Sequence, residues 1–224
     1  MRLRRTLSDA VRRRRVLPLM IALRGLYLVT DRTQTAGRPL TEVVAAALRG
    51  GARLVQLRER DLPTRALLAL ATELRVLTRA AGAALLINDR VDIALACDAD
   101  GVHLPGHSFA VADARALLGP HRLIGVSTHA PEEVAAAQGA GADYAVFGPL
   151  FDTPSKRAFG APLGLDGLRR ARALATLPLF GIGGVAPANA AAVRAAGADG
   201  VAVIRAVLAA ADPAAAAAAL ADGA

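Results

Sequence analysis

The sequence predicts an α/β fold in which a single (β/α)8 barrel follows a basic N-terminal extension. From residue 25 onward, short aliphatic and β-branched runs alternate with Ala- and Leu-rich segments of helical period, a pattern typical of βα units. Eight such repeats close most naturally into a barrel of the TIM type. The 224 residues also fall within the size range of one barrel domain.

Eight short segments carry the strand pattern. The expected strands are residues 25–30, 53–58, 84–88, 101–104, 122–127, 143–148, 179–184 and 200–205. Similar phrases, "GGARLVQL", "GAGADYAVFG" and "AAGADGVAVI", introduce three of them. In each phrase a glycine is expected to end a helix in a left-handed cap before a turn and a buried strand, which indicates a repeated unit.

Segments of helical period lie between these strands. The expected helices are residues 40–49, 63–80, 110–118, 131–138, 165–175 and 187–195, with an Ala-rich pair after residue 205. The tail "PAAAAAALADGA" is expected to cover the outer face of the barrel. An open doubly wound sheet is the alternative, but the glycine-rich turn that dinucleotide-binding folds need after their first strand is absent. The predicted domains are an extension over residues 1–22 and a barrel over residues 23–224.

The net charge of +8 is concentrated at the N-terminus. Eight arginines and a single acidic residue, Asp9, fall within the first 24 residues, so the remainder of the chain is nearly neutral. Arginine at this density can bind nucleic acid or an anionic membrane, but a solvated extension is commoner. We therefore predict neither nucleic acid nor membrane as a partner, and leave a homodimer open.

Targeting signals and disulfides are not expected either. The apolar run "VLPLMIAL" is short for a signal-peptide core and lacks an A-x-A cleavage site, and no run reaches the ~20 residues of a membrane span. The single cysteine, Cys97, cannot form an internal disulfide and is expected to be a buried structural thiol. These features predict a cytoplasmic protein.

Polar residues collect where the predicted strands end. In a (β/α)8 barrel the chemistry lies at the carboxyl ends of the strands, so each end can be inspected separately. Six ends carry polar side chains: Thr30, Asp31 and Arg32; Gln56, Arg58, Glu59 and Arg60; Asn88 and Asp89; His103, His107 and Ser108; Ser127, Thr128 and His129; and Thr153, Ser155 and Lys156. Their convergence on one rim predicts a ligand site.

The second strand carries Gln56, Arg58 and Arg60 in alternation, which predicts that all three point to one face and into the barrel. A structural ion pair with Glu59 or Asp31 is an equally common role for any one of these residues.

Two further segments predict anion binding. In "FGIGGVAPANA", after the seventh strand, Gly183 and Gly184 leave backbone N–H groups exposed, and a helix starts directly after the eighth strand. Loops seven and eight with a helix N-terminus form the usual phosphate site of such barrels, and Arg205 either adds charge there or points to solvent. The only lysine, Lys156, is expected to form a second anion-binding group with Thr153 and Ser155 across the mouth.

Taken together, these segments resemble the thiamin phosphate synthase and thiazole tautomerase (TenI-type) family from about Gly25 onward. The resemblance rests on "LYLVTD", "VQLRERD", "INDRVDIAL", "DADGVHL", "IGVSTH", "GADYAVFGPLFDTPSKRAFGAPLGLDGL", "GIGG" and "AGADGVAVI", which occur in the order of that family. It implies an enzyme of thiamin biosynthesis that acts on small phosphorylated substrates.

The synthase branch of this family couples hydroxymethylpyrimidine diphosphate to a thiazole phosphate and releases pyrophosphate. By resemblance, Gln56, Arg58 and Lys156 hold the diphosphate, and Asn88 and Asp89 bind it together with Mg²⁺. The remaining lining residues are Ser127, Thr153 and Ser155. Cations on the departing pyrophosphate suit a reaction that separates charge.

Two departures from the synthase pattern favour the tautomerase branch slightly. Ser108 stands where synthases usually carry a second metal-binding aspartate, and Arg60 replaces a usual lysine. The phrases "LPGHSF" and "RER" resemble the tautomerase branch, which needs no metal and in which His129 is the acid–base residue. An orienting role for His129 is as frequent, since synthases carry a histidine there too, and Asp89 with "TPSK" resembles the synthases.

Two other functions were weighed. A non-catalytic regulatory member of the family predicts a barrel mouth without functional groups, whereas this mouth is rich in them. A barrel that acts on a different sugar phosphate shares the glycine loop but not "INDR" and "TPSK" together.

Overall fold

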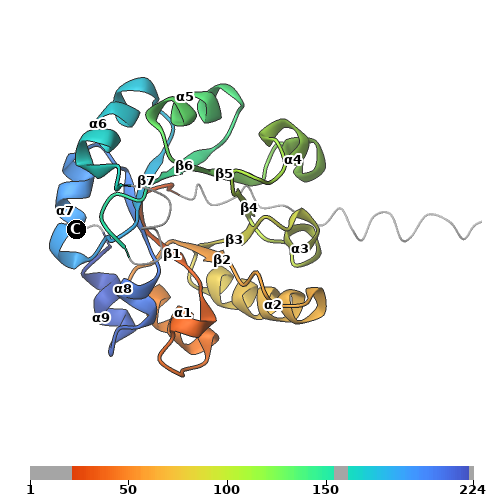
Figure 1. Cartoon of the computed structure of the whole chain (residues 1–224). Coiled ribbons are helices and arrows are strands. Elements are labelled where there is room, and N and C mark those ends of the chain that lie inside the picture. Colours follow the sequence, from red (N-terminus) through yellow and green to blue (C-terminus); the bar gives the residue numbers. More distant parts are fainter. Residues whose placement is uncertain (1–21, 154–160, 222–224) are drawn as a thin grey trace, which may run out of the picture.

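The computed structural model of the protein describes residues 22–153 and 161–221. Eight parallel strands close into one barrel in the order of the chain, surrounded by helices (Figure 1). The strands are β1 (Gly25–Val29), β2 (Leu54–Leu57), β3 (Ala84–Asn88), β4 (Gly101–Leu104), β5 (Leu123–Thr128), β6 (Tyr144–Phe147), β7 (Leu179–Ile182) and β8 (Gly200–Val203). The predicted fold class and all eight predicted strands are confirmed.

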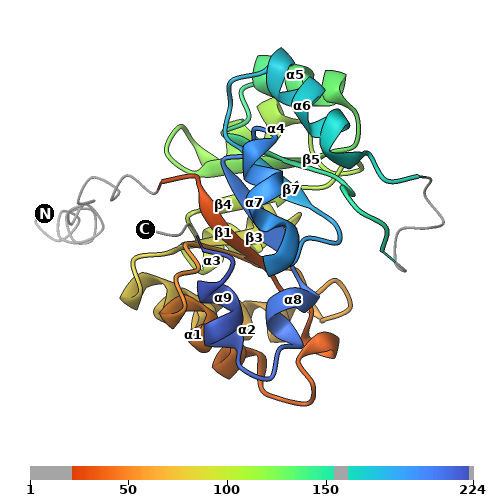
Figure 2. The same cartoon turned by 90° about the vertical axis from the view of Figure 1, so that its left-hand side faces the viewer.

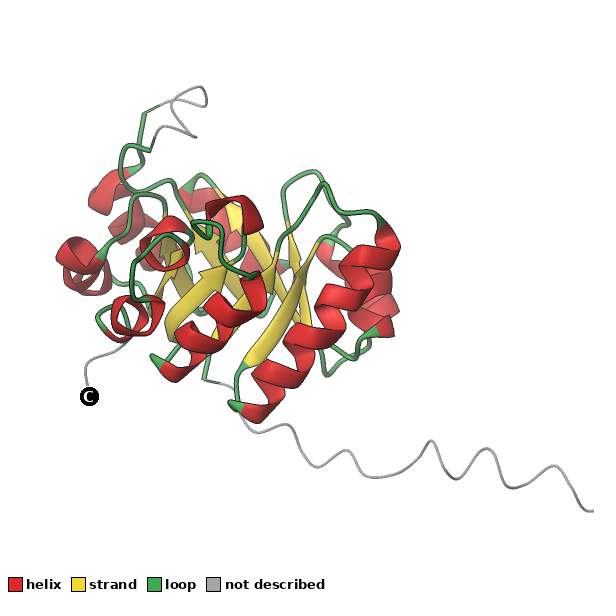
Figure 3. Ribbon diagram, turned by 90° about the horizontal axis from the view of Figure 1, so that it is seen from below, coloured by secondary structure: helices red, strands yellow, loops and turns green. Residues whose placement is uncertain are grey.

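The helices lie outside the barrel (Figure 3). They are α1 (Leu40–Arg49), α2 (Thr64–Ala80), α3 (Val91–Ala96), α4 (Val111–Leu118), α5 (Pro131–Gly139), α6 (Gly164–Leu174), α7 (Pro187–Ala195), α8 (Arg205–Leu208) and α9 (Pro213–Ala218), with a 3-10 helix, η1 (Arg32–Gln34). The sequence analysis missed α3 and η1, because six and three residues are too few for a helical period to be recognised.

The first and last strands pair directly and close the barrel. Gly25 of β1 lies opposite Gly200 of β8, and the parallel register continues to Leu28 opposite Val203. A Cβ on Gly200 would approach Cε1 of Phe180 to 2.6 Å and would also clash with the backbone of Gly25. Glycine at position 200 is therefore required for the closing strands and the ring of Phe180 to pack together.

Two buried clusters fill the structure. The smaller one occupies the barrel interior and consists of Tyr27, Leu54, Ala84, Leu86, Tyr144, Val146, Phe180 and Ala202. The larger one contains alternate strand residues and the inner faces of the helices, for example Leu85, Ile87 and Val102 with Val43, Val44 and Leu74. Successive strand residues alternate between these clusters, because side chains along a strand point to opposite faces.

An Arg–Asp pair recurs at the amino ends of three even-numbered strands. The aspartate just before β4, β6 or β8 accepts the backbone N–H of a residue on the preceding strand and pairs with an arginine of a nearby helix. The three sets are Asp100 with Leu85 and Arg75, Asp143 with Ile124 and Arg115, and Asp199 with Leu179 and Arg172. The aspartate of the repeated "AD" phrase thus links the start of its strand to the preceding strand and to a helix.

The C-terminal helix α9 packs on α1, as expected for the tail. A Cβ on Gly50, which follows α1, would lie 2.8 Å from Cβ of Ala217, so glycine allows the close approach. Arg38 fixes the neighbouring turn by donating to the carbonyl oxygens of Leu208 and Ala210 at 2.9 and 2.8 Å. Within the described part of the chain, no helix is long and apolar enough to cross a membrane.

The Arg–Asp repeat predicts a measurable stability difference. In Asp143→Ala, the N–H of Ile124 and the guanidinium of Arg115 both lose their carboxylate partner. Because a hydrogen bond to a charged group contributes about 1.5–3 kcal/mol, we expect a loss of that order in the free energy of unfolding, measured with urea.

Arg169→Ala is the matched control, since it removes the exposed ion pair with Asp166 and keeps the carboxylate near the start of α6. That change should cost less than about 1 kcal/mol. Equal losses in the two variants would contradict a special role for the repeat.

Candidate active site

The carboxyl ends of all eight strands face one end of the barrel, because every neighbouring pair is parallel. Figure 2 shows the barrel from the side, with the loops after β1 (orange) and β6 (green to cyan) at the same end. The polar residues predicted from the sequence follow strands that end on this rim.

Glu59 organises the loop after β2. Its carboxylate is buried, accepts from Oγ1 of Thr30 at 2.7 Å and from the backbone N–H of Arg32 at 3.1 Å, and pairs with Nη1 of Arg32 at 3.1 Å. Arg32 also pairs with the exposed Asp61 at 2.6 Å. This ion pair differs from the one weighed in the sequence analysis, in which a residue of the Gln56, Arg58 and Arg60 trio would pair with Glu59 or Asp31.

Arg58 and Arg60 are left without such partners. Their guanidinium groups donate no hydrogen bond to any residue that the structure describes, because Glu59 between them is directed to Arg32. Burial and then the positive charge of Arg60 lower the pKa of Arg58, and the negative charges of Asp31 and Glu59 offset part of this effect. An anion bound near Arg58 would relieve this cost.

Only Gln56 of the alternating trio lies inside the barrel. Gln56 is 3% exposed, Arg58 is half-buried, and Arg60 is exposed beyond the end of β2. The expectation that all three line the interior was wrong, because β2 ends at Leu57 and the two arginines extend past the strand.

A hollow at the rim brings Arg60, Asn88, Asp89 and His107 together. Asp89 has a φ of +65°, a left-handed conformation that short Asx side chains tolerate, and its N–H donates to the carbonyl oxygen of His103 at 2.9 Å. Oγ of Ser108 donates to Oδ1 of Asp89. Ser108 is thus placed beside Asp89, as expected for the position of a second carboxylate.

A dedicated metal cage is absent from residues 22–153 and 161–221, where no three His, Cys, Asp or Glu side chains are grouped to hold an ion. Oδ2 of Asp89 has no hydrogen-bond donor among these residues. The oxygen donors available here for a hard cation are Oδ2 of Asp89 and the side-chain amide oxygen of Asn88.

His129 is exposed and follows β5. Its Nδ1 lies 2.5 Å from the carbonyl oxygen of Gly148, which can only accept, so Nδ1 carries a hydrogen. Its backbone N–H donates to Glu133 at 2.6 Å. The geometry is compatible with both roles weighed for His129, proton transfer through Nε2 and orientation.

The loops after β6 and β7 run side by side. The N–H groups of Leu150 and Phe151 donate to the carbonyl oxygens of Ile182 and Gly183 at 2.8 and 3.0 Å. Thr153 therefore lies on the same side of the mouth as the glycine loop, because β6 and β7 are neighbours, and for this residue the predicted placement across the mouth was wrong. Ser155 and Lys156 lie outside the described residues.

The glycine loop exposes backbone donors. Gly183 and Gly184 have φ values of +94° and +70°, and neither N–H has an acceptor among the described residues. Oγ1 of Thr153 is buried and also lacks a partner there. The exposed Arg205 begins α8 as expected, but α8 has only four residues, so its dipole adds little.

A chain of hydrogen bonds crosses the barrel interior and joins two predicted site residues. Nε2 of Gln56 donates to the Tyr27 hydroxyl at 2.8 Å, which lies 2.9 Å from the Tyr144 hydroxyl. Nδ1 of His103 lies 3.3 Å from that hydroxyl, and Nε2 of His103 lies 2.9 Å from Oγ of Ser127. Gln56 and Ser127 are thereby linked, although β2 and β5 are not adjacent.

The sequence analysis missed Tyr27 and Tyr144 as members of the site. A signal was present, because these are the only two tyrosines of the chain and both fall in predicted strands at interior positions. Which hydroxyl meets which partner depends on the barrel closing, and that is invisible in the sequence.

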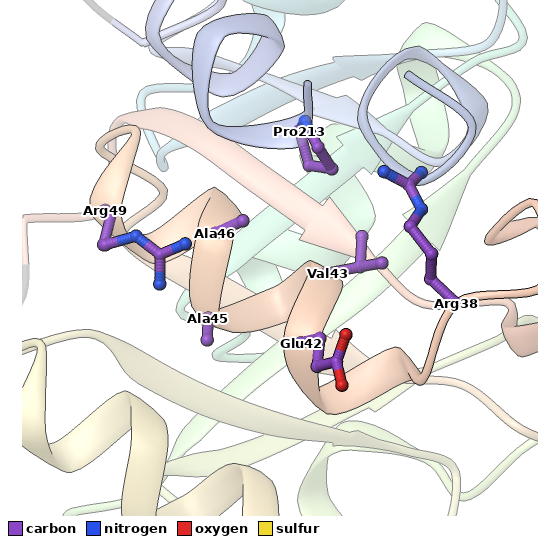
Figure 4. A pocket seen from close by; sticks show the side chains of 7 residues that line it. All are labelled: Arg38, Glu42, Val43, Ala45, Ala46, Arg49 and Pro213. Carbon is purple, nitrogen blue, oxygen red and sulfur yellow. The ribbon is translucent and has the colours of Figure 1, made fainter. Parts of the chain in front are cut away.

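A groove on the outer surface lies apart from this mouth. It runs along α1 beside the start of α9 and is lined by Arg38, Glu42, Val43, Ala45, Ala46, Arg49 and Pro213 (Figure 4). The Arg38 guanidinium is already occupied by carbonyl oxygens. The functional groups of the rim are not part of this groove.

The family pattern described as "Thiamine monophosphate synthase" matches residues 26–207. The chain belongs to this family. It is 51% identical over 192 residues to a thiamine-phosphate synthase of Moorella thermoacetica, which covers 86% of this chain and 91% of that one. A Roseiflexus relative with the same name is 50% identical over 195 residues, 87% of this chain and 83% of its own.

A solved structure agrees with the fold and the family. The "thiamine phosphate pyrophosphorylase" of Pyrococcus furiosus is 38% identical, with a TM-score of 0.81 over 88% of this chain and 94% of that chain. A 3-hexulose-6-phosphate synthase, 21% identical with a TM-score of 0.62, shares the fold. The predicted family is confirmed, and the chain is an enzyme of thiamin biosynthesis in this family.

The comparisons bear differently on the two branches. The relatives described above carry the name of a synthase, which supports the alternative of the sequence analysis. The slightly favoured tautomerase-like interpretation is not supported. The departures at Ser108 and Arg60 involve two positions, which count for little against 51% identity over 192 residues.

Burial of His103 predicts a pH dependence of stability. Burial and then the charge of Arg58 lower the pKa of His103 to about 3, from 6.5 in an unfolded chain. Between these values only the unfolded chain binds the proton, so stability falls as the pH falls, by up to about 1.4 kcal/mol per pH unit from this group. Urea unfolding at pH 7, 6 and 5 should give a smaller slope for His103→Gln than for the unmodified protein.

Replacement of the exposed His121 by Gln is the control and should leave the slope unchanged. If His103→Gln and the unmodified protein lose stability in parallel on acidification, His103 is not buried as the neutral form.

Crowding at Gly184 gives a second prediction. A Cβ there would approach Cβ of Phe151 to 2.7 Å, whereas a Cβ on Gly37, with a similar φ of +79°, would meet nothing within 4 Å. Both Gly→Ala changes incur strain of about 1–2 kcal/mol, but Gly184→Ala must also displace the loop after β6. We expect the larger loss of stability, and weaker binding of inorganic phosphate, in Gly184→Ala; identical behaviour would show that the two loops are not tightly packed.

Proposed function

We propose that this family member is a thiamin phosphate synthase that couples hydroxymethylpyrimidine diphosphate to a thiazole phosphate and releases pyrophosphate. The names of relatives about 50% identical over most of the chain support this activity. A cytoplasmic location remains a prediction, as do the boundary after residue 22 and the oligomeric state.

One observation carries the proposal: Arg58 and Arg60 are cations without an acceptor among the described residues, at the rim of the barrel. Two neighbouring guanidinium groups that form no ion pair offer several donors to a bound anion. A diphosphate offers several negative oxygens and suits both arginines at once. In our proposal Lys156 and Ser155, which belong to the loop after β6, extend this site.

The chemistry follows from this charge arrangement. The bond between the pyrimidine methylene carbon and the diphosphate oxygen breaks, and its electron pair leaves with the pyrophosphate. The thiazole nitrogen then donates its lone pair to the methylene carbon, so the C–N bond forms and the positive charge of the pyrimidine methylene cation passes to the thiazolium ring. Arg58 and Arg60 stabilise the negative charge that develops on the leaving group, which lowers the barrier most where water is excluded.

The donor set fits Mg²⁺ only when the substrate is present. Mg²⁺ in phosphate-transferring sites is held by one or two carboxylates together with substrate phosphate oxygens and water. Oδ2 of Asp89 and the amide oxygen of Asn88 are the protein donors proposed to hold it. When bound, the ion neutralises diphosphate charge and so makes pyrophosphate a better leaving group.

The phosphate of the thiazole is proposed to lie at the N–H groups of Gly183 and Gly184, with Thr153 beside it. Backbone amides that lack internal acceptors are ready donors to an anion. Gln56 on β2 and Ser127 on β5 are proposed to contact the pyrimidine portion. His129 is proposed to orient neighbouring groups at the mouth of the barrel. Arg205, which is exposed at the start of α8, is proposed to add positive charge to the phosphate site.

The decisive experiment assays the purified chain with the pyrimidine diphosphate and the thiazole phosphate, with Mg²⁺ or with EDTA. We expect pyrophosphate release that requires Mg²⁺, is lost in Asp89→Asn, and falls less than about 10-fold in His129→Ala. Ser108→Asp should raise activity at low Mg²⁺ because it restores a second carboxylate.

The same preparations are assayed for isomerisation of a thiazole carboxylate phosphate. A tautomerase loses about 10²- to 10⁴-fold in His129→Ala, is insensitive to EDTA, and gains nothing from Ser108→Asp. Metal-independent isomerisation in a protein that does not couple the two substrates would overturn the proposal.

A further inference from the structure

The polar residues inside the barrel form a continuous path between two walls of the mouth. Tyr27 and Tyr144 are fully buried, and His103 is 4% exposed. The path ends at Gln56 on one side and at the half-buried Ser127 on the other. Buried hydroxyl and imidazole groups at this depth must be hydrogen-bonded, since leaving one unpaired costs more than the bond gains.

The strands are adapted to this path. His103, Gly125 and Tyr144 lie side by side on β4, β5 and β6. A Cβ on residue 125 would collide with the Tyr144 ring. Glycine therefore opens the way for the Tyr144 hydroxyl to reach Nδ1 of His103 across β5.

The aromatic rings hold the hydroxyl groups in place. Tyr27 and Tyr144 meet edge to face with ring centroids 5.8 Å apart, and both pack edge to face on Phe180 at 5.5 and 5.8 Å. Such contacts restrict the rings without using their hydroxyl groups. Packing of the rings thus sets the positions of the two hydroxyl oxygens. The hydrogen-bond partners of these oxygens determine which group donates.

The donor order follows from the Gln56 end. The amide nitrogen of Gln56 donates to the Tyr27 hydroxyl, whose own hydrogen has one acceptor within reach among the described residues, the Tyr144 hydroxyl. If Tyr27 donates there, Tyr144 is left to donate to Nδ1 of His103, and the ring then carries its hydrogen on Nε2 and donates to Oγ of Ser127. With Oγ already accepting, the Ser127 hydroxyl hydrogen is left for an acceptor outside the path.

The charge state of His103 is consistent with this order. Burial first, and the neighbouring Arg58 second, lower the pKa of His103 to about 3, so the ring is neutral near pH 7. A neutral ring has one donor and one acceptor nitrogen, whereas an imidazolium would have two donors and would break the order at Tyr144.

We propose that Tyr27, Tyr144 and His103 are positioning residues that fix Ser127 as a hydrogen-bond donor toward the bound substrate. The substrate atom that faces Ser127 is therefore an acceptor, such as a ring nitrogen or an anionic oxygen. None of the three needs to touch the substrate. The kinetic effect expected from this inference rests on the proposed synthase activity. The hydrogen-bond order can be tested without an activity assay.

The structural test is NMR of the full chain labelled with ¹⁵N-histidine. The His103 signals, identified by their loss in His103→Gln, should show a neutral ring with hydrogen on Nε2 from pH 5 to pH 8. In Tyr144→Phe the preference for that tautomer should weaken, because Nδ1 has lost its donor. An Nδ1-protonated or charged ring at pH 7 in the unmodified protein would overturn the proposal, whatever the enzyme does.

The kinetic test compares Tyr144→Phe, Ser127→Ala and the double variant in the coupling reaction. Loss of one oriented hydrogen bond corresponds to about a 3- to 10-fold change, and we expect it as a rise in KM for the pyrimidine diphosphate. In the Ser127→Ala background, Tyr144→Phe should add less than about twofold, since both changes remove the same donor. Full multiplication of the two effects would show that Tyr144 does not act through Ser127.

Phe180→Leu is the matched control, because it loosens the same rings but removes no hydrogen bond. It should lower Tm, and it should change the His103 tautomer and the KM less than Tyr144→Phe does. His103→Gln, which retains an amide donor, should keep more activity than His103→Leu; equal activities would contradict the proposal. If the unmodified protein does not couple the substrates, the proposed function fails, and the NMR result still decides the hydrogen-bond order.

Discussion

The pairing of β1 with β8 is the constraint on which the rest of this structure depends. It converts a row of eight parallel strands into a ring, with all carboxyl ends on one rim and a closed interior. Polar residues that lie far apart in the chain, such as Gln56 and Ser127, can then face the same space. The small residues at the closure, Gly25 and Gly200, are part of this constraint because a larger side chain at position 200 would collide with Phe180.

The hydrogen bonds and the ion pair of Glu59 determine which arginines at the rim are paired. The carboxylate is directed to Thr30 and Arg32. Arg58 and Arg60, its neighbours in sequence, therefore form no ion pair with a described residue, although the charges of Asp31 and Glu59 act on Arg58. The direction of one carboxylate thus separates a structural ion pair from the two arginines of the proposed anion site.

The hydrogen bonds inside the barrel connect to residues near its mouth. Tyr27, Tyr144 and His103 satisfy one another inside the barrel, where an unpaired polar atom would be costly. The same bonds reach the rim at both ends. Stability of the interior and orientation of the mouth are therefore coupled, so a change to a buried hydroxyl is expected to be felt at the substrate.

The sequence by itself determined the fold class, all eight strands and the family. Alternating strand and helix periods leave few other topologies for a parallel sheet, and the repeated glycine phrases mark where the units begin. It also predicted that the polar residues at the strand ends share one rim of the barrel. These conclusions depend on local patterns, which are readable along the chain. The short helices α3 and η1 escaped because they are shorter than a period can reveal.

Tertiary structure alone decided which polar groups meet. Glu59 pairs with Arg32 and not with Arg58, Thr153 lies beside the glycine loop and not across from it, and Tyr144 reaches His103 over Gly125. Each of these contacts joins residues on different strands, and its partner depends on strand order, register and the point where a strand ends. A one-residue change in register would turn Gln56 or Tyr144 away from the interior. The sequence names the groups of the site, and only the closed barrel sets the distances between them.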